Sequence, residues 1–97
     1  MSRSTRWTFL TNHAVVLLQV WKNPDVTVRE IAERVEVTER AVHRILADLN
    51  ASGYLLRRRI GRRSHYSVSS DRPLRHPLTA HVEVERLLQV LDPTPRP

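Results

Sequence analysis

Cysteine is absent from this chain, which excludes disulfide bonds and metal sites built on thiolates. Glycine is scarce: only Gly53 and Gly61 occur, so the chain has no glycine-rich loop of the kind that cradles nucleotide phosphates. No potential nucleophile has an evident general base beside it. These absences predict a binding protein without a cofactor and argue against an enzyme.

Long apolar runs are also absent. The stretch from Trp7 to Trp21 is short of the roughly 20 apolar residues that a membrane-spanning helix needs. Polar residues interrupt it, among them Thr11, Asn12, His13 and Gln19. No small-residue cleavage pattern follows, as a secretory signal would require. We therefore expect a cytoplasmic protein with no membrane partner.

Acidic residues are outnumbered, with 10 against 16 basic ones, and the formal net charge is +6. Lys22 is the only lysine, and the remaining basic residues are arginines, whose planar guanidinium can hold phosphate or guanine through two parallel hydrogen bonds. This balance favours a polyanionic partner. A high arginine content can equally reflect the base composition of a genome, so the placement of the arginines has to decide.

The first predicted helix spans residues 12–22, with Thr11 or Asn12 as its N-cap. A helix that is apolar on two sides needs two partners. We expect its own domain to cover one side and a second subunit to cover the other. The two apolar stripes are Ala14, Leu17, Leu18 and Trp21 on the first side, and Val16 and Val20 on the second.

A helix-turn-helix follows this segment. Thr27 and Glu30 form a capping-box pattern at the start of a second helix, which should end near Arg34. After a turn at residues 35–37, Thr38 caps a third helix that should stop at Gly53 in a left-handed conformation. At about 100° per residue, this third helix has an inner side of Val42, Ile45, Leu46 and Leu49 and an outer side of Arg40, Arg44, Ala47 and Ala51, with His43 on the flank.

Residues 54–68 alternate as a β-hairpin with Gly61 in its turn. We expect Tyr54, Leu56 and Ile60 to face inward and Arg57 and Arg59 to face outward. Residues 69–77 form a linker, residues 78–91 a C-terminal dimerisation helix, and residues 92–97 a frayed tail. The fold class is mostly α with a small β-hairpin wing (α+β), in one domain over residues 1–97 with a core at about 12–68.

The arrangement resembles the winged helix-turn-helix transcriptional regulators of the ArsR and MarR groups, with flanking N- and C-terminal helices. The matching residues are Ile31-Ala32, Val35, Val37-Thr38, Ala41-Val42, Arg44, Leu46 and the wing-like segment RRRIGRRSHYSV. Two features depart from the pattern. Glu36 stands where such turns often carry glycine, so the turn must accept it in a left-handed position. One helix on each side of the winged domain is also closer to the ArsR layout.

The resemblance implies that the third helix enters the major groove of double-stranded DNA while the wing meets the backbone or the minor groove. Arg40 and Arg44 are candidates for guanine or for phosphate. Glu39 either accepts from a cytosine amino group or complements the positive helix N-terminus, and His43 either contacts DNA or is an idle surface residue. The expected DNA-binding residues are Thr27, Thr38, Glu39, Arg40, His43, Arg44, Arg57, Arg59, Arg62 and Arg63.

A homodimer is expected because two apolar surfaces exceed what one small domain can cover; the alternative is that the last helix packs on the first within one chain. The expected dimerisation residues are Val16, Val20, Val84, Leu87, Leu88 and Leu91. The only candidate metal ligands are His76, His81 and Glu85. The alternative is that they are ordinary residues of an interface, without a metal. Our prediction is no metal and no small-molecule effector.

Two other functions stay open at this stage. A winged helix can serve as an assembly module whose basic wing binds RNA or an acidic protein, since fold alone does not determine function. The chain can also be an architectural protein that binds DNA without regard to sequence. Selection of a palindromic motif from random duplexes would exclude the second, and a preference for structured RNA would favour the first.

Overall fold

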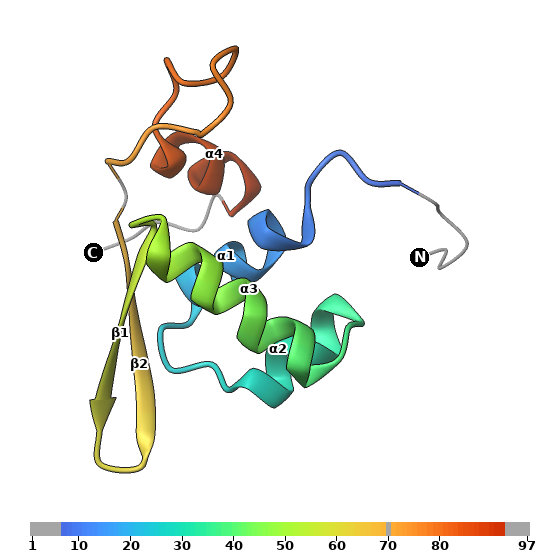
Figure 1. Cartoon of the computed structure of the whole chain (residues 1–97), viewed down its shortest axis with the longest axis vertical. Helices are drawn as coiled ribbons and strands as arrows, with labels where there is room; N and C mark the ends of the chain where they lie inside the picture. The colour runs from blue at the N-terminus through green and yellow to red at the C-terminus, as the bar shows by residue number, and fades with distance from the viewer. Residues whose placement is uncertain (1–6, 70, 93–97) are drawn as a thin grey trace.

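The computed structural model describes residues 7–69 and 71–92. The elements follow in the order α1 (Asn12–Lys22), α2 (Val28–Val35), α3 (Glu39–Ala51), β1 (Leu55–Ile60), β2 (Arg63–Val68) and α4 (Val84–Leu91) (Figure 1). Four helices with one antiparallel hairpin confirm the predicted fold class. The expected tail, apart from Asp92, lies outside the described residues.

Helix α1 occupies the centre of the domain and contacts α2, α3, β2 and α4. Thr11, one of the two candidates from the sequence, is its N-cap and accepts a hydrogen bond from the Ala14 amide at 3.1 Å. Val16 and Val20 are both 0% exposed. The expectation that these valines face a second subunit is therefore wrong, because other elements of the same chain cover the second side of α1.

The helix-turn-helix forms where the sequence places it. The Thr27 hydroxyl accepts from the Glu30 amide at 3.1 Å, and the Glu30 carboxylate accepts from the Thr27 amide at 2.9 Å, which completes the capping box. Glu36 ends α2 with φ 64°, so the turn does take a non-glycine residue into the left-handed region. Thr38 then caps α3 by accepting from the Ala41 amide at 3.0 Å.

The hairpin differs from its expected phase. Leu55 is 3% exposed whereas Leu56 is 57% and Ile60 58% exposed, so the inward residue is Leu55. The register explains the difference, since Leu55 lies opposite Val68, and Arg57 lies opposite the buried Tyr66. Beyond these pairs the hairpin extends past the core (Figure 1), and every residue of β1 after Leu55 is exposed.

The last helix is shorter than predicted. Helix α4 begins at Val84 and not near residue 78, because residues 73–83 form turns and a bridge between Pro73 and Glu83. The Leu74 amide donates to the Val82 carbonyl at 2.9 Å, which holds this segment as a loop. His81 therefore lies in this loop and Glu85 in α4, so these two candidate metal ligands do not share a helix.

The capping box makes stability depend on pH in a defined direction. Hydrogen bonds from Thr27 hold the pKa of Glu30 below its ordinary value of 4.5. A carboxyl whose pKa is lowered by folding stabilises the protein above that ordinary value, and the contribution is lost as pH falls through the lowered pKa. We expect Glu30→Gln to lose this acid-dependent part of the free energy of unfolding, measured by urea denaturation between pH 7 and pH 3.

The matched control is Glu33→Gln, which removes an exposed carboxylate from the same helix outside the capping box. If the free energy of unfolding depends on pH in the same way in both variants, the capping box does not make the acid-dependent contribution to stability.

Candidate nucleic-acid interface

Helix α3 separates a buried side from an exposed side. Val42, Ile45, Leu46 and Leu49 are at most 7% exposed and hold the helix on the core. The opposite side is open to solvent and carries Arg40, His43, Arg44, Ala47 and Ala51. This confirms the predicted orientation of the helix, with two guanidinium groups one turn apart on its free surface.

The N-terminal end of α3 belongs to the same exposed surface. Thr38 and Glu39 are both exposed, and Glu39 lies in the first turn. The Thr38 hydroxyl oxygen is occupied by the cap, but its proton remains able to donate. Because the first amides of a helix carry a partial positive charge, this end favours an anion such as phosphate.

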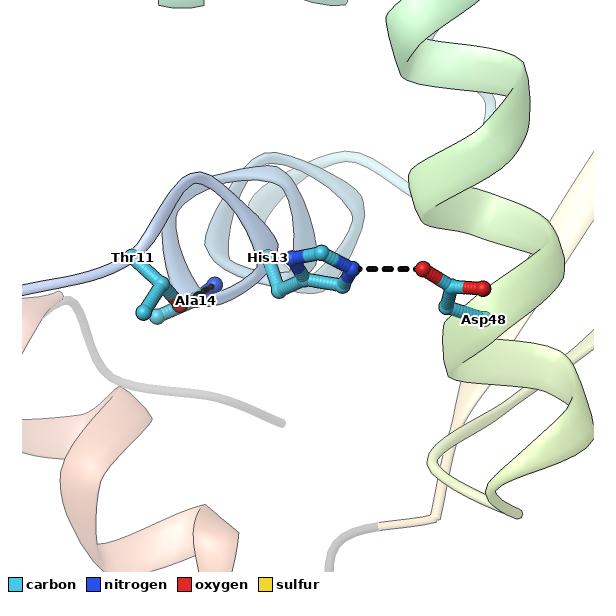
Figure 2. Close-up of polar contacts among 4 residues, drawn as sticks. All are labelled: Thr11, His13, Ala14 and Asp48. Carbon is cyan, nitrogen blue, oxygen red and sulfur yellow. Dashed lines mark hydrogen bonds and ion pairs between the residues drawn. The ribbon is translucent and has the colours of Figure 1, made fainter.

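A polar contact joins α1 to α3 on the flank of this surface. Figure 2 shows His13 of α1 directed at Asp48 of α3, with 2.8 Å between Nε2 and Oδ2. Both side chains are about half exposed, so the contact contributes modestly to stability, roughly 0.2–1 kcal/mol. Its main effect is on position, because it holds the C-terminal half of α3 against α1.

The wing carries five arginines, and all of them are exposed: Arg57, Arg58, Arg59, Arg62 and Arg63. Within the part of the chain that the structure describes, none of them forms an ion pair. Because no carboxylate of the described residues is paired with it, this positive charge is available for an anionic partner.

Pairing across the hairpin places the arginines on both of its faces. Arg57 and Arg59 lie opposite Tyr66 and Ser64, on the face that continues from the core. Arg58 and Arg63 are on the other face. Arg58 is absent from the sequence-based candidates because the expected alternation puts it with the inward residues. The sequence signal that includes it is the group of five arginines within residues 57–63.

The base of the wing is fixed to the body of the domain. The Tyr66 amide donates to the Pro24 carbonyl at 2.9 Å, and His65 Nδ1 lies 3.0 Å from Asp25 Oδ1. Segment 23–26 leads directly into the capping box of α2, and strand β1 contacts α3. The base of the wing is therefore held to the same helical body that carries α3.

The candidate dimerisation residues divide into two groups. Val16, Val20, Val84 and Leu88 are at most 3% exposed within the single chain, so they are core residues and the expectation that they meet a second subunit is wrong. Leu87 is half-buried and Leu91 is 36% exposed. Both remain accessible at the surface of α4.

A cavity of about 580 Å³ has Leu87 in its lining. It is lined mostly by apolar side chains from the start of α1, the end of α3, the 74–79 loop and α4, among them Phe9, Leu17, Leu49, Tyr54, Leu74 and Leu87.

Among the described residues, no three histidine, aspartate or glutamate side chains come close enough to hold a metal ion. No described helix is long and apolar enough to span a membrane.

The family is shown by comparison with known proteins. Residues 8–69 match the model of the MarR family. This range includes the helix-turn-helix and the wing and exceeds half of the chain. The chain therefore belongs to the MarR family of winged helix-turn-helix transcriptional regulators, a family without enzymatic activity. The resemblance to the MarR group is thus confirmed. The sequence alone favoured a layout of the flanking helices nearer to that of the ArsR group.

Several solved structures share this architecture. FabT of Streptococcus pneumoniae, solved in complex with DNA, is 25% identical, with a TM-score of 0.55 over 69% of this chain and 50% of FabT. ZitR of Lactococcus lactis, also in complex with DNA, is 15% identical, with a TM-score of 0.55 over 71% of this chain and 49% of ZitR.

PcaV of Streptomyces coelicolor, solved with its natural ligand, is 22% identical, with a TM-score of 0.56 over 98% of this chain and 66% of PcaV. The chain spans about half the length of FabT and ZitR. No curated protein sequence matches the chain significantly.

The unpaired wing charge leads to a test. We expect Arg62→Ala combined with Arg63→Ala to weaken binding to every duplex alike. The slope of log K against log salt should become shallower by about 0.9 for each phosphate that the variant no longer binds. Fluorescence anisotropy over a salt series measures both effects. Arg86→Ala removes an exposed arginine from α4 and is the control; an unchanged slope in the double variant would remove the wing tip from the interface.

Proposed function

We propose that this protein is a sequence-specific double-stranded DNA-binding transcriptional regulator that acts in the cytoplasm. Helix α3 enters the major groove, and the wing contacts the backbone and the adjacent minor groove. The observation that carries the proposal is the exposed side of α3 together with the exposed wing. Seven of their arginines have no carboxylate partner among the described residues: Arg40, Arg44 and the five of the wing.

Each element has its own part in binding. Arg40 and Arg44 bind guanine edges, and Thr38, Glu39 and His43 surround them on the first turns of α3. Thr27, exposed at the N-terminus of α2, faces the phosphate backbone with the positive end of that helix. Arg57, Arg58, Arg59, Arg62 and Arg63 neutralise phosphates. The small Ala47 lets the helix approach the groove wall closely.

We propose in addition that the regulator is a homodimer formed at the end of the molecule that carries α4. Phe9 is 93% exposed, Leu78 80%, Val90 78% and Leu91 36%. Phe9 and Leu87 also line the cavity of about 580 Å³. Either a small apolar molecule or side chains of a second copy can fill such a cavity, and the uncovered Phe9 beside it favours the second copy.

A two-fold arrangement would give the two α3 helices a spacing of about one duplex turn, and the preferred site would then be palindromic. If the dimer contacts roughly eight phosphates, the salt slope is about −7. Binding to structured RNA in place of duplex DNA would instead favour the alternative of an assembly module.

Selection from random duplexes tests the main proposal. We expect one palindromic motif to be enriched. Arg40→Ala and Arg44→Ala should each relax the preference at one position per half-site, at a cost of about 1–3 kcal/mol in discrimination. The Arg62→Ala and Arg63→Ala variant serves as the comparison, since it should weaken binding while leaving the motif unchanged. A pool without any enriched motif would identify a non-specific architectural protein.

The dimer surface can be tested separately. We expect Leu91→Glu to convert the dimer to a monomer, because burying a carboxylate among apolar side chains is costly. Size-exclusion chromatography with light scattering at micromolar concentration measures the mass. Leu56→Glu is the matched control, since Leu56 is 57% exposed on the wing and should not change the mass. A wild-type chain that is monomeric under these conditions contradicts the proposed dimer.

A further inference from the structure

The C-terminal end of α3 is closed by backbone hydrogen bonds. The Gly53 amide donates to the Asn50 carbonyl at 3.1 Å, and the Tyr54 amide donates to the Leu49 carbonyl at 2.9 Å. With Gly53 at φ +83°, these two bonds form a Schellman motif. Helix α3 has no basic residue in its last turn, so its negative end lacks a cation of its own.

Arg72 supplies that cation from the segment after the wing. Its Nη2 donates to the Ser52 carbonyl at 3.1 Å. The guanidinium lies directly over Gly53, where an added Cβ would come within 3.1 Å of Nη2 and 3.2 Å of Cζ. Position 53 thus favours glycine for two reasons: its backbone is left-handed, and a side chain there would crowd this guanidinium.

The backbone of the same residue holds the start of α4. The Arg72 carbonyl accepts from the amide of Val84 at 2.8 Å, and Val84 is the first residue of α4 and 3% exposed. The Tyr54 hydroxyl donates to the carbonyl of Pro73, which keeps the segment against the end of α3. One residue therefore joins two helices, with its side chain on α3 and its carbonyl on α4.

We infer that Arg72 is a positioning residue for sequence recognition. It sets the tilt of α3 relative to α4, while the contact from His13 to Asp48 holds α3 against α1. Hydrogen bonds to base edges require placement within about 0.5 Å, whereas phosphate contacts carry no sequence information directly. Removal of the Arg72 side chain therefore reduces specific binding more than non-specific binding. The inference rests on the proposed function, because it concerns the geometry of the same recognition helix.

The test compares Arg72→Ala with Arg75→Ala, which removes the same charge from the same segment. Arg75 is exposed and forms no hydrogen bond or ion pair with another of the described residues. We expect Arg72→Ala to bind the selected duplex about fivefold more weakly than Arg75→Ala does. Affinity for an unrelated duplex, and the salt slope, should be equal for the two variants. A direct phosphate contact by Arg72 would instead lower the slope by about 0.9.

Amide hydrogen exchange gives a readout that needs no DNA. The amides of Gly53 and Tyr54 should exchange faster in Arg72→Ala than in Arg75→Ala, because the end of α3 is then no longer bound to the segment before α4. If Arg72→Ala does not fold, Arg72→Lys replaces it in both measurements, since lysine keeps the charge and loses the planar fork.

Three results would overturn the inference. The first is equal affinity of the two variants for the selected duplex, the second is a lower salt slope in Arg72→Ala alone, and the third is unchanged exchange at Gly53 and Tyr54. Failure of the proposed function is distinguishable, because the wild-type chain would then select no duplex at all. If the wild-type chain selects a motif, and Arg72→Ala binds that motif as well as Arg75→Ala does, only the positioning role is overturned.

Discussion

The burial of α1 is the constraint on which the rest of the structure depends. Val16 and Val20 are completely buried, and the helix that carries them contacts α2, α3, β2 and α4. Each fully buried valine contributes roughly 1.5–3 kcal/mol, so this helix accounts for a large part of the stability of so small a domain. Since α3, strand β2 of the wing and α4 all pack on α1, their relative positions follow from its two apolar sides.

Around this centre, short polar contacts determine how the interface is presented. His13 holds α3 to α1, the Tyr66 amide holds the wing to the segment before α2, and Arg72 connects the end of α3 with the start of α4. None of these contacts involves the arginines of the exposed surface. The protein thus uses one set of polar groups to build the interface and leaves another set free for a ligand.

This separation has a physical cause. An arginine that is paired with a carboxylate must lose that partner before it can bind phosphate, which weakens association. On the wing, the carboxylates that would pair with the arginines are absent from the neighbouring strand positions, where Ser64, His65 and Tyr66 stand instead. Solvent and salt screen the repulsion among these charges, and the proposed function depends on their remaining unpaired.

Local sequence signals determined most of the architecture. The N-caps at Thr11, Thr27 and Thr38, the capping box and the stop at Gly53 were all predictable, because each depends on residues within a few positions of one another. The same holds for the orientation of α3, whose apolar and polar residues separate at helical spacing. Family membership was indicated for this reason, since its motifs are local.

Tertiary structure decided what periodicity leaves open. The apolar stripe of Val16 and Val20 requires a partner, but its spacing does not say whether that partner belongs to the same chain. The phase of β1 depended on pairing with β2, and the start of α4 at Val84 depended on bonds from the Pro73–Leu74 segment. The contact of Arg72 with the end of α3 joins residues 20 positions apart. A sequence specifies which surfaces must be covered, whereas only the assembled chain shows what covers them, because burial is shared among residues distant in sequence.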